Sequence, residues 1–393
     1  MAKPYRVQVL NQISAHGLKR LPAELYEIGK DIADPDAILV RSADMHSLTI
    51  AGSVRAIGRA GAGTNNIPVS AMSTRGVPVF NAPGANANAV KELVLAGMLM
   101  AARNLPAALQ FVAGLDASDP NMDSRVEDGK KAFAGFELTG HTLGVIGLGR
   151  IGCLVADAAI RLGMHVIGYD PDITVDAAWS LPAQVRKANS VAELLKASHF
   201  VSIHVPLVAA TKHLINAQAL ETMRPGAVLL NFSREGVVDD NALLAALAAE
   251  RLRCYVCDFP GPAIHRHPRA IALPHLGAST REAEDNCAQM VADQIRDYLE
   301  HGNIRNAVNF PDAVAPRESA YRVAIANANV PNMLGQISTA MAQANLNIRN
   351  MLNKSRGEMA YTLVDVDSEV PVAAIESIGR IQGVLSVRYL LAP

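Results

Sequence analysis

Three glycines at fixed spacing follow an apolar run in the segment TLGVIGLGRIGCLVADAAIRLGMHVIGYD, residues 142–170. Gly147 permits a tight turn after a strand, Gly149 lets a pyrophosphate approach the backbone, and Gly152 lets the next helix pack on the strand. The start of that helix offers free N–H groups to a phosphate. The next apolar run closes with Asp170, whose carboxylate can accept hydrogen bonds from ribose hydroxyls. The segment therefore predicts a dinucleotide site, and Asp170 favours NAD because its charge repels the 2′-phosphate of NADP.

A second group of reactive residues is the C-x-x-C formed by Cys254 and Cys257, with His265 and His267 shortly after it. Such residues bind a metal ion when their spacing brings the side chains together. The surrounding run RCYVCDF predicts a strand, however, and residues three apart in a strand face opposite sides. The chain has no second C-x-x-C. We therefore expect no metal site.

The composition excludes several classes of protein. The chain has 393 residues, enough for two or three domains, and a formal net charge of −1 with acids and bases interspersed. It has no basic block of the kind that binds nucleic acids or membrane surfaces. The longest apolar stretch, LVLAGMLMAA, is too short to span a bilayer and predicts a buried helix. With no apolar signal segment at the amino end and only four cysteines, we expect a reduced, cytoplasmic protein.

Predicted strands and helices alternate along most of the chain. Long helices are expected over 88–103 and 280–300, and helix-like segments separate most of the strands. This alternation predicts parallel sheets with helices on both faces, which is an α/β fold. The runs that predict strands are YRVQVL, AILVRS, RAIGRAG, VPVFNAP, TLGVIGLG, HVIGYD, HFVSIHVP, AVLLNFS, RCYVCDF and AIALPH.

The pattern changes after HGNIRNAVNFPDAVAPRES, an irregular segment that predicts a linker. Strands are expected at YRVAIAN, LNIRNML, MAYTLVDVD and VLSVRYLL, and helices at NMLGQISTAMAQAN and PVAAIESIGRIQ. In the first helix, Met333, Leu334, Ile337 and Met341 share one face. The order β-α-β-β-α-β predicts a small ferredoxin-like domain.

Six segments resemble, in order and spacing, the D-isomer-specific 2-hydroxyacid dehydrogenases. They are IGRAGAGTNNI, NAPGANANAVKELVLAGML, GLGRIG, HVPLVAATKHLIN, NFSREGVVDDNALLAAL and LPHLGAST. The likeness is greatest to the members that oxidise 3-phospho-D-glycerate to 3-phosphohydroxypyruvate, the first step of serine biosynthesis. It covers almost the whole chain, and the C-terminal unit resembles an ACT domain, a module that senses amino acids.

The resemblance implies two doubly wound parallel-sheet domains and a regulatory domain. A substrate-binding domain of residues 1–98 is completed by 284–312, and a Rossmann NAD-binding domain covers 99–283. A linker over 313–318 leads to the ferredoxin-like ACT domain over 319–393. The active site is expected in the cleft between the two larger domains. Because ACT domains commonly pair edge to edge, we also expect a homodimer or homotetramer.

The resemblance also implies catalytic roles. His275 in LPHLGAST matches the histidine that exchanges the hydroxyl proton, a role that suits a side chain titrating near neutral pH. Arg234 in NFSREG matches the arginine that binds the substrate carboxylate and polarises the forming carbonyl. The family's third residue, a glutamate that orients the histidine, has no counterpart, because no acid lies between Phe259 and His275. Either another carboxylate reaches His275 in space, or the histidine acts without one and is a poorer proton donor.

Other residues match positions that bind the family's cofactor and substrate. The NAD site is expected at the glycine loop and on loops after strands, where ligands of open α/β sheets sit. Asp258 matches the aspartate beside the nicotinamide amide, whereas His204 could equally be a core residue. The expected cofactor residues are Gly147, Gly149, Arg150, Ile151, Gly152, Asp170, His204, Pro206, Thr211, Ser233 and Asp258. A phosphorylated substrate needs cations beyond Arg234, and the expected substrate residues are Arg41, Ser42, Arg59, Arg75 and Asn81.

Asn329 and Asn347 match the asparagines that bind the amino acid in serine-regulated relatives. Feedback by L-serine is therefore expected, and the alternative is an ACT domain kept only for assembly.

Two rival functions stay open. One is reduction of hydroxypyruvate or glyoxylate by a related dehydrogenase. The other is a non-catalytic NAD-sensing protein on the same fold, which the missing glutamate favours and which His275 and Arg234 oppose.

Overall fold

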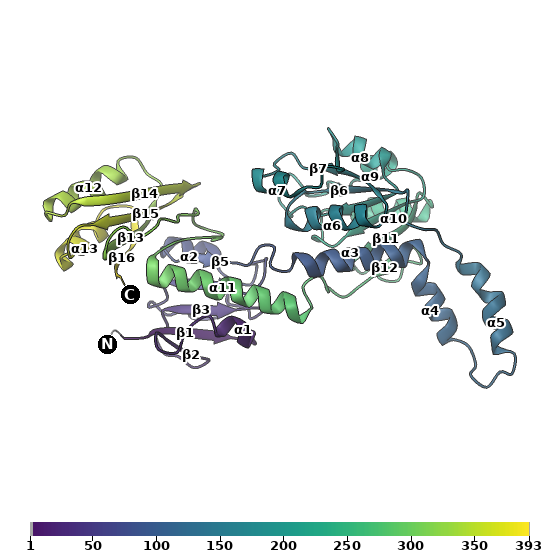
Figure 1. Cartoon of the computed structure of the whole chain (residues 1–393), viewed down its shortest axis with the longest axis horizontal. Helices are drawn as coiled ribbons and strands as arrows, with labels where there is room; N and C mark the ends of the chain where they lie inside the picture. The colour runs from purple at the N-terminus through teal and green to yellow at the C-terminus, as the bar shows by residue number, and fades with distance from the viewer. Residues whose placement is uncertain (1–2, 393) are drawn as a thin grey trace. The chain divides into compact units, whose positions relative to one another are not determined.

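The computed structural model describes residues 3–392, which fall into two compact units. One unit contains the residues up to Asn86 together with those from Arg281 onward, and the other is Ala87–Thr280. Each unit contains one large parallel sheet, and the first also carries a small antiparallel sheet near the end of the chain (Figure 1). The expected fold class, two doubly wound α/β domains followed by a ferredoxin-like domain, is confirmed.

The first unit contains a five-stranded parallel sheet, sheet A, in the order β2-β1-β3-β4-β5. Along β3, Ala37 and Leu39 pack in the core beneath α11, whereas Ile38 and Val40 pack in the core beneath α2. An apolar strand thus serves two cores, as a sheet covered on both faces requires. The elements are β1 (Tyr5–Leu10), α1 (Ala15–Leu18), β2 (Tyr26–Gly29), β3 (Ala37–Val40), β4 (Ala56–Arg59), α2 (Val69–Thr74), β5 (Val79–Phe80) and α11 (Arg281–His301).

Helix α11 lies along sheet A although it comes from far later in the chain (Figure 1). Gly58 on β4 permits this close contact, because a Cβ there would lie 3.1 Å from Ile295 and 3.4 Å from Val291. After the helix, the Asn309 side chain accepts a hydrogen bond from the Val79 N–H at 2.9 Å. The sheet is therefore completed by a segment that begins at Arg281, close to the expected start at residue 284.

The second unit contains a seven-stranded parallel sheet, sheet B, in the order β12-β11-β10-β9-β6-β7-β8. Helices α3 and α6 cover one face and α8, α9 and α10 the other. The strands are β6 (Thr142–Ile146), β7 (His165–Tyr169), β8 (Arg186–Lys187), β9 (Phe200–Ile203), β10 (Ala227–Asn231), β11 (Leu252–Cys257) and β12 (Ala270–Ala272). The helices are α3 (Ala87–Ala102), α6 (Arg150–Arg161), α7 (Val175–Ser180), α8 (Val191–Ala197), α9 (Ala217–Thr222) and α10 (Asp240–Ala248).

The boundary between the units differs from the one expected from the sequence. The expected boundary at residue 98 falls within helix α3, but the whole length of this helix belongs to the second unit. Val90, Val94 and Met98 pack in the core shared with α6 and sheet B. Gly97 faces Phe232 and Val256 of that core, so the helix packs closely on the sheet.

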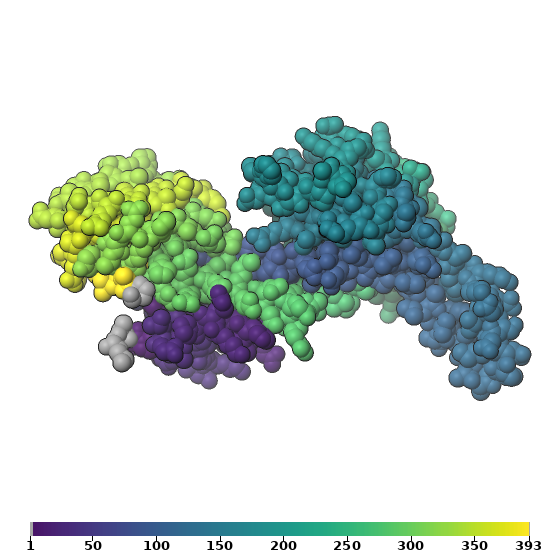
Figure 2. Space-filling view, in the orientation of Figure 1, coloured from purple at the N-terminus to yellow at the C-terminus, as the bar shows by residue number. Residues whose placement is uncertain are grey.

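Residues 105–133 project from the second unit as a helical arm (Figures 1 and 2). The arm consists of α4 (Leu105–Ala113), α5 (Met122–Gly129) and a 3-10 turn, η1 (Lys130–Phe133). Neither α4 nor α5 contains a buried residue, and Leu109 is 71% exposed. In the described part of the chain, no single helix is long and apolar enough to cross a membrane. Helices α3 and α4 meet that criterion only jointly, across a bend of 69°.

The C-terminal domain (Tyr321–Leu391) is a four-stranded antiparallel sheet in the order β14-β15-β13-β16, with two helices on one face. Val323, Ile325 and Val364 pack under these helices. The predicted β-α-β-β-α-β order is confirmed. The elements are β13 (Tyr321–Ala328), α12 (Met333–Gln343), β14 (Ile348–Arg356), β15 (Met359–Val366), α13 (Val372–Gly379) and β16 (Val384–Leu391).

The other face of this small sheet packs on α11 and the segment that follows it in the same unit. Tyr361 and Leu390 share a core with Leu299 and Phe310. Within that contact Arg322 is fully buried and forms a bidentate ion pair with Asp365, with N···O distances of 2.6 and 2.8 Å. Its guanidinium also donates to the carbonyls of His301, Ala315 and Pro316. The C-terminal domain is thus joined to its neighbour by a buried, hydrogen-bonded charge.

Replacing Arg322 by Met should lower the unfolding free energy by about 3–5 kcal/mol, because Asp365 stays buried without its counter-ion. Urea denaturation followed by circular dichroism measures the loss. Arg380→Met is the matched control, since its ion pair with Glu376 is exposed, and it should change stability little. Equal effects from both substitutions would contradict a structural role for the buried pair.

Candidate functional site

The strands of sheet B end in register, and this gathers the sequence-predicted residues at one edge. Ile146 pairs with Ile203, Ile203 with Asn231, and Asn231 with Cys257. The residues that follow these strand ends therefore lie side by side at the carboxyl edge of the sheet, which is the ligand edge of open α/β folds. They are Gly147 to Gly152, His204, Pro206, Ser233, Arg234 and Asp258, with His275 after β12.

The glycine loop has the geometry that a pyrophosphate requires. A Cβ on Gly152 would lie 2.0 Å from the Gly147 carbonyl oxygen, so only glycine lets α6 start so close to β6. A Cβ on Gly149 would meet nothing within 4 Å, so this side of the loop is open to a ligand. Arg150 and Ile151 are the first residues of α6, whose amino end faces the loop.

Asp170 is held beside this loop at the end of β7. Its Oδ2 accepts a hydrogen bond from the Leu148 N–H at 2.8 Å, and its Oδ1 accepts one from the Asp172 N–H at 3.0 Å. A cavity of about 390 Å³ adjoins it, lined by apolar residues that include Ile173, Leu181 and Val185. An apolar slot next to a fixed carboxylate suits an adenosine, with its ring in the slot and its ribose on Asp170. These residues fit NAD.

Arg234 is presented by a turn that Asn231 builds. The buried Asn231 side chain donates to the Arg234 carbonyl at 3.0 Å and accepts from the Ser233 N–H and hydroxyl. The Arg234 side chain itself is exposed. The Arg234 guanidinium donates to the adjacent Ser233 carbonyl at 2.6 Å, and its exposure leaves other N–H groups accessible to a carboxylate.

His275 is also exposed, and two contacts fix it. Its backbone N–H donates to the backbone carbonyl of Asp258 at 2.9 Å. Its imidazole ring packs on the Phe259 ring, with the two ring centroids 4.4 Å apart. Within residues 87–280, no carboxylate hydrogen-bonds to the imidazole. Within residues 87–280 the structure thus shows no carboxylate in place of the family's glutamate, and the two alternatives that the sequence leaves open both stay predictions.

Asp258 lies directly beneath these two groups. It is 1% exposed; its Oδ2 accepts from the Gly277 N–H at 3.1 Å, while its Oδ1 is buried without a partner. Burial raises the pKa of Asp258, although the Gly277 N–H and the charges of His275 and Arg234 lower it in part. A buried oxygen that lacks a donor suits the amide of a nicotinamide, the role implied for this residue.

His204 follows β9, and burial lowers its pKa to about 4. Its Nε2 lies 2.8 Å from the Ser202 hydroxyl, and its Nδ1 is buried without a partner. The ring is therefore neutral near pH 7 and is not an acid–base group there. Thr211 closes the next turn, with its hydroxyl bonded to the Pro206 carbonyl at 2.5 Å.

In the first unit, the candidate substrate residues Arg41, Ser42, Arg59 and Asn81 lie at the carboxyl edge of sheet A. The register aligns Leu10 with Val40 and Val40 with Arg59, so the loops after β1, β3 and β4 start together. Arg59 donates to the Arg41 carbonyl at 3.0 Å, which places two guanidinium-bearing residues side by side. The Asn81 side chain donates to the Ala62 carbonyl at 2.6 Å.

Arg75 does not join this group. It follows α2, which returns the chain to the amino edge of sheet A, opposite Arg59. Its guanidinium donates to the carbonyls of Ile50 and Ala51 at 3.1 and 2.6 Å. This placement does not support the expectation that Arg75 is a substrate residue, because its side chain holds the loop at Ile50 and Ala51.

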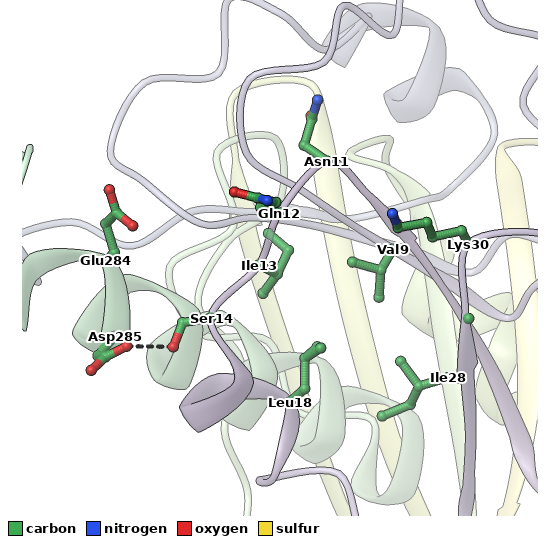
Figure 3. Close-up of a pocket in the computed structure, with 11 residues that line it drawn as sticks. Val9, Asn11, Gln12, Ile13, Ser14, Leu18, Ile28, Lys30, Glu284 and Asp285 are labelled. Atoms are coloured by element: carbon green, nitrogen blue, oxygen red, sulfur yellow. Dashed lines mark hydrogen bonds between the residues drawn. The ribbon is translucent and has the colours of Figure 1, made fainter. Parts of the chain in front are cut away.

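Sequence reasoning missed Lys30, which follows β2 at the same edge as Arg41 and Arg59. A cavity of about 580 Å³ opens there, lined by Lys30, Asn11, Glu284 and other residues (Figure 3). Strand β2 has only four residues and includes Glu27 and Gly29, so the sequence carries no clear strand signal that would have placed a lysine at a ligand edge.

The two candidate effector residues lie at opposite ends of the small sheet. Asn329 follows β13 and donates to the Gly357 carbonyl at the β14–β15 turn, at 3.0 Å. Asn347 precedes β14, and its N–H donates to Asp367 beyond the other end of β15. Strand β15 separates them by eight residues, or about 26 Å. One copy of the chain therefore cannot bring both to one small ligand.

The cysteine pair follows strand geometry. Cys254 packs in the core on the α3 side of sheet B and Cys257 in the core on the opposite side. The two histidines make local contacts, His265 with the Pro262 carbonyl and His267 with the Arg269 N–H. In residues 3–392 no cluster of three metal-binding side chains occurs.

The low pKa of His204 makes the fold acid-sensitive. The unfolded chain binds a proton near pH 6.5 and the folded chain only near pH 4, so His204 destabilises the fold increasingly as the pH falls from 6.5 to 4. Relative to His204→Gln, the wild type should lose about 2 kcal/mol between pH 7.5 and pH 5. Urea unfolding at both pH values measures the difference. His165→Gln, at an exposed histidine, is the control. If the difference in unfolding free energy between wild type and His204→Gln is the same at pH 7.5 and pH 5, the prediction is wrong.

Asp258→Asn should stabilise the protein at pH 7 while impairing turnover. The raised pKa means that the ionised carboxylate costs folding free energy above pH 3.8, and the neutral amide avoids this cost. We expect a gain on the order of 1 kcal/mol that shrinks on acidification toward pH 3.8. Thermal melts from pH 4 to 7.5 measure it. A variant less stable than wild type at pH 7 would show that the carboxylate is satisfied.

Comparison with known proteins agrees with this geometry. The family model described as "D-isomer specific 2-hydroxyacid dehydrogenase, NAD binding domain" matches residues 95–277. The chain is 38% identical over 295 residues to a D-3-phosphoglycerate dehydrogenase of Methanocaldococcus jannaschii, covering 73% of this chain but 54% of that one. It is 32% identical over 344 residues to the D-3-phosphoglycerate dehydrogenase of Escherichia coli, covering 84% of this chain and 79% of that one.

Among solved structures, the chain is similar to the TT0316 protein of Thermus thermophilus, with a TM-score of 0.63 and 27% identity. That match covers 77% of this chain and 99% of the other. The order of the motifs, the NAD-compatible glycine loop and the presence of His275 and Arg234 agree with these similarities. The chain belongs to the family of NAD-dependent, D-isomer-specific 2-hydroxyacid dehydrogenases.

Proposed function

We propose that the protein oxidises 3-phospho-D-glycerate to 3-phosphohydroxypyruvate with NAD, the first step of serine biosynthesis. The observation that carries this proposal is the pair Arg41 and Arg59 at the carboxyl edge of sheet A, with Lys30 after β2 on the same edge. A substrate with a carboxylate and a phosphate needs more cations than Arg234 alone. Relatives that carry the name D-3-phosphoglycerate dehydrogenase support the same substrate. The four cysteines, none of them in a disulfide, suit a cytoplasmic enzyme.

The residues of the second unit suit the chemistry. Bound NAD would accept a hydride from the hydroxyl-bearing carbon of the substrate. His275 would take the hydroxyl proton, and its exposed ring is accessible for that transfer. Arg234 would hold the carboxylate and stabilise the charge that develops on the oxygen. Asp258 would orient the nicotinamide amide, and Phe259 would keep the imidazole plane fixed.

A reductase of glyoxylate or hydroxypyruvate remains the rival enzyme, because its smaller substrate uses the same His275 and Arg234. The two functions differ in whether the protein must bind a phosphate. A non-catalytic NAD-binding protein is the rival of another class, and it predicts NAD binding without turnover.

Regulation by L-serine is part of the proposal, through an ACT-type role of the C-terminal domain. Since Asn329 and Asn347 lie at opposite ends of the sheet, a serine bound by both must lie between two copies of the chain. Strand β14 is an edge strand and can pair with its copy in a partner, which supports such an arrangement. We therefore propose a homodimer or homotetramer, to which the exposed apolar side chains of α4 also contribute.

The test is NADH formation from 3-phosphoglycerate, with and without millimolar L-serine and with NADP in place of NAD.

Arg59→Met should lower kcat/KM for 3-phosphoglycerate by about 10- to 100-fold but leave glyoxylate reduction within about threefold, because only the first substrate carries a phosphate. Arg75→Met is the matched control, since it removes an arginine from the opposite edge of the sheet.

Equal losses with both substrates would refute the phosphate role of Arg59. NAD binding without turnover of 3-phosphoglycerate or glyoxylate would favour the non-catalytic rival. Turnover that serine does not change, in a protein whose mass by light scattering is that of an oligomer, would leave the C-terminal domain with an assembly role only.

A further inference from the structure

The first turn of α11 holds the loops that carry the candidate substrate residues. Glu284 Oε1 lies 2.7 Å from Arg41 Nη2. Asp285, the next residue, accepts a hydrogen bond from the Ser14 hydroxyl and lies 3.3 Å from His16 Nδ1. Figure 3 shows Glu284 and Asp285 on the helix beside the cavity, facing the loop that follows β1. The orientation of Arg41 therefore depends on where this end of α11 lies.

The last turn of α11 is held by the C-terminal domain and its linker. A helix leaves its last four carbonyls without partners inside the helix. Here five successive carbonyl oxygens, from residue 298 to residue 302, each accept a hydrogen bond from a side chain that follows the helix. The bonds are Arg388 to Tyr298 at 3.0 Å and to Leu299 at 2.9 Å, Arg317 to Glu300 at 3.2 Å, Arg322 to His301 at 3.1 Å, and Tyr361 to Gly302 at 2.7 Å.

These contacts are buried or partly buried, and four of the five have an arginine as the donor. The Arg388 guanidinium stacks over the Tyr298 ring at 4.4 Å, and Arg322 is fully buried. Three cations meet the negative end of the helix dipole, which strengthens each hydrogen bond. Between its two ends α11 is packed on β4 through Gly58. A displacement at residues 298–302 therefore moves the helix as one piece, because a packed helix is stiff along its axis.

We propose that Glu284 is a positioning residue for Arg41 and that α11 couples it to the C-terminal domain. The proposal rests on the proposed function, because it takes Arg41 as a ligand of the phosphorylated substrate. Glu284 occupies one nitrogen of the guanidinium and leaves the others for the ligand. The C-terminal domain then sets substrate affinity by fixing the far end of the helical segment from Glu284 to Leu299, which is about 22 Å long.

The test is a double-mutant cycle on the full-length protein, with KM for 3-phosphoglycerate, KM for NAD and kcat as readouts. Glu284→Ala should raise the KM for 3-phosphoglycerate about tenfold. Glu284→Gln keeps an acceptor oxygen, so its KM should stay close to that of the wild type. Arg388→Met should raise the same KM about threefold, with kcat and the KM for NAD unchanged. In the Glu284→Ala background Arg388→Met should have no further effect, because the coupling ends at that carboxylate.

Two further variants keep the test decisive. Tyr361→Phe removes one donor with little change in packing, and should give a smaller shift in the same direction if Arg388→Met fails to fold. Arg380→Met, at an exposed residue directly after α13, is the control without effect. Additive effects in the cycle, or an unchanged KM in both Arg388→Met and Tyr361→Phe, would overturn the coupling. A lower KM in Glu284→Ala would show that the carboxylate competes with the substrate instead of positioning Arg41.

Hydrogen exchange separates this proposal from the proposed function. Without any substrate, Arg388→Met should speed amide exchange at residues 281–287 and in the loop after β3, relative to Arg380→Met. If the enzyme does not turn over 3-phosphoglycerate and this change is present, the coupling stands and the substrate assignment fails. If turnover is present and exchange at these residues is unchanged, the coupling fails alone.

Discussion

The alignment of strand ends in a parallel sheet is the constraint on which the rest of this structure depends. In sheet B the register brings Ile146, Ile203, Asn231 and Cys257 to one line, and every catalytic or cofactor candidate follows one of these ends or that of β7 or β12. In sheet A the same rule places Arg41 beside Arg59 and leaves Arg75 at the other edge. Loop residues far apart in sequence thus become neighbours because the strands that precede them end together.

The candidate catalytic edge also concentrates groups that are costly to fold. Asp258 is a buried carboxylate with one unpartnered oxygen, and His204 has a buried ring nitrogen without a partner. Neither unpartnered atom stabilises the fold, but both residues lie at the edge of sheet B where a nucleotide is expected to bind. His275, by contrast, is exposed and held by Phe259 and a main-chain hydrogen bond. Within residues 87–280 the imidazole packs on the Phe259 ring, and no carboxylate is hydrogen-bonded to it.

Much of this could be predicted from the sequence, because long apolar strands and glycine spacing are local signals. The glycine loop, Asp170 and most strands of both parallel sheets lie where the pattern placed them. Other features depend on topology or on contacts that no local pattern carries. Strand β2 has only four residues and carries no clear sequence signal, so the position of Lys30 could not be predicted. The motif that contains Arg75 does not show that α2 returns the chain to the amino edge of sheet A. Arg322 and Arg388 sit in strands and resemble residues of a solvent-exposed face, yet both are packed against α11.

The origin of α11 far down the chain has a consequence for biosynthesis on the ribosome. The nucleotide unit, Ala87–Thr280, is continuous and holds all the strands of its sheet, so it can complete its fold as soon as it leaves the exit tunnel. The strands of sheet A emerge first but lack the helix that covers one face until residues 281–301 follow. During that interval Leu39 and its neighbours have no cover, so the earliest part of the chain to be made is completed only after the nucleotide unit. If synthesis pauses once the chain up to about residue 280 has left the exit tunnel, the nucleotide unit is folded while the amino-terminal segment still lacks its covering helix.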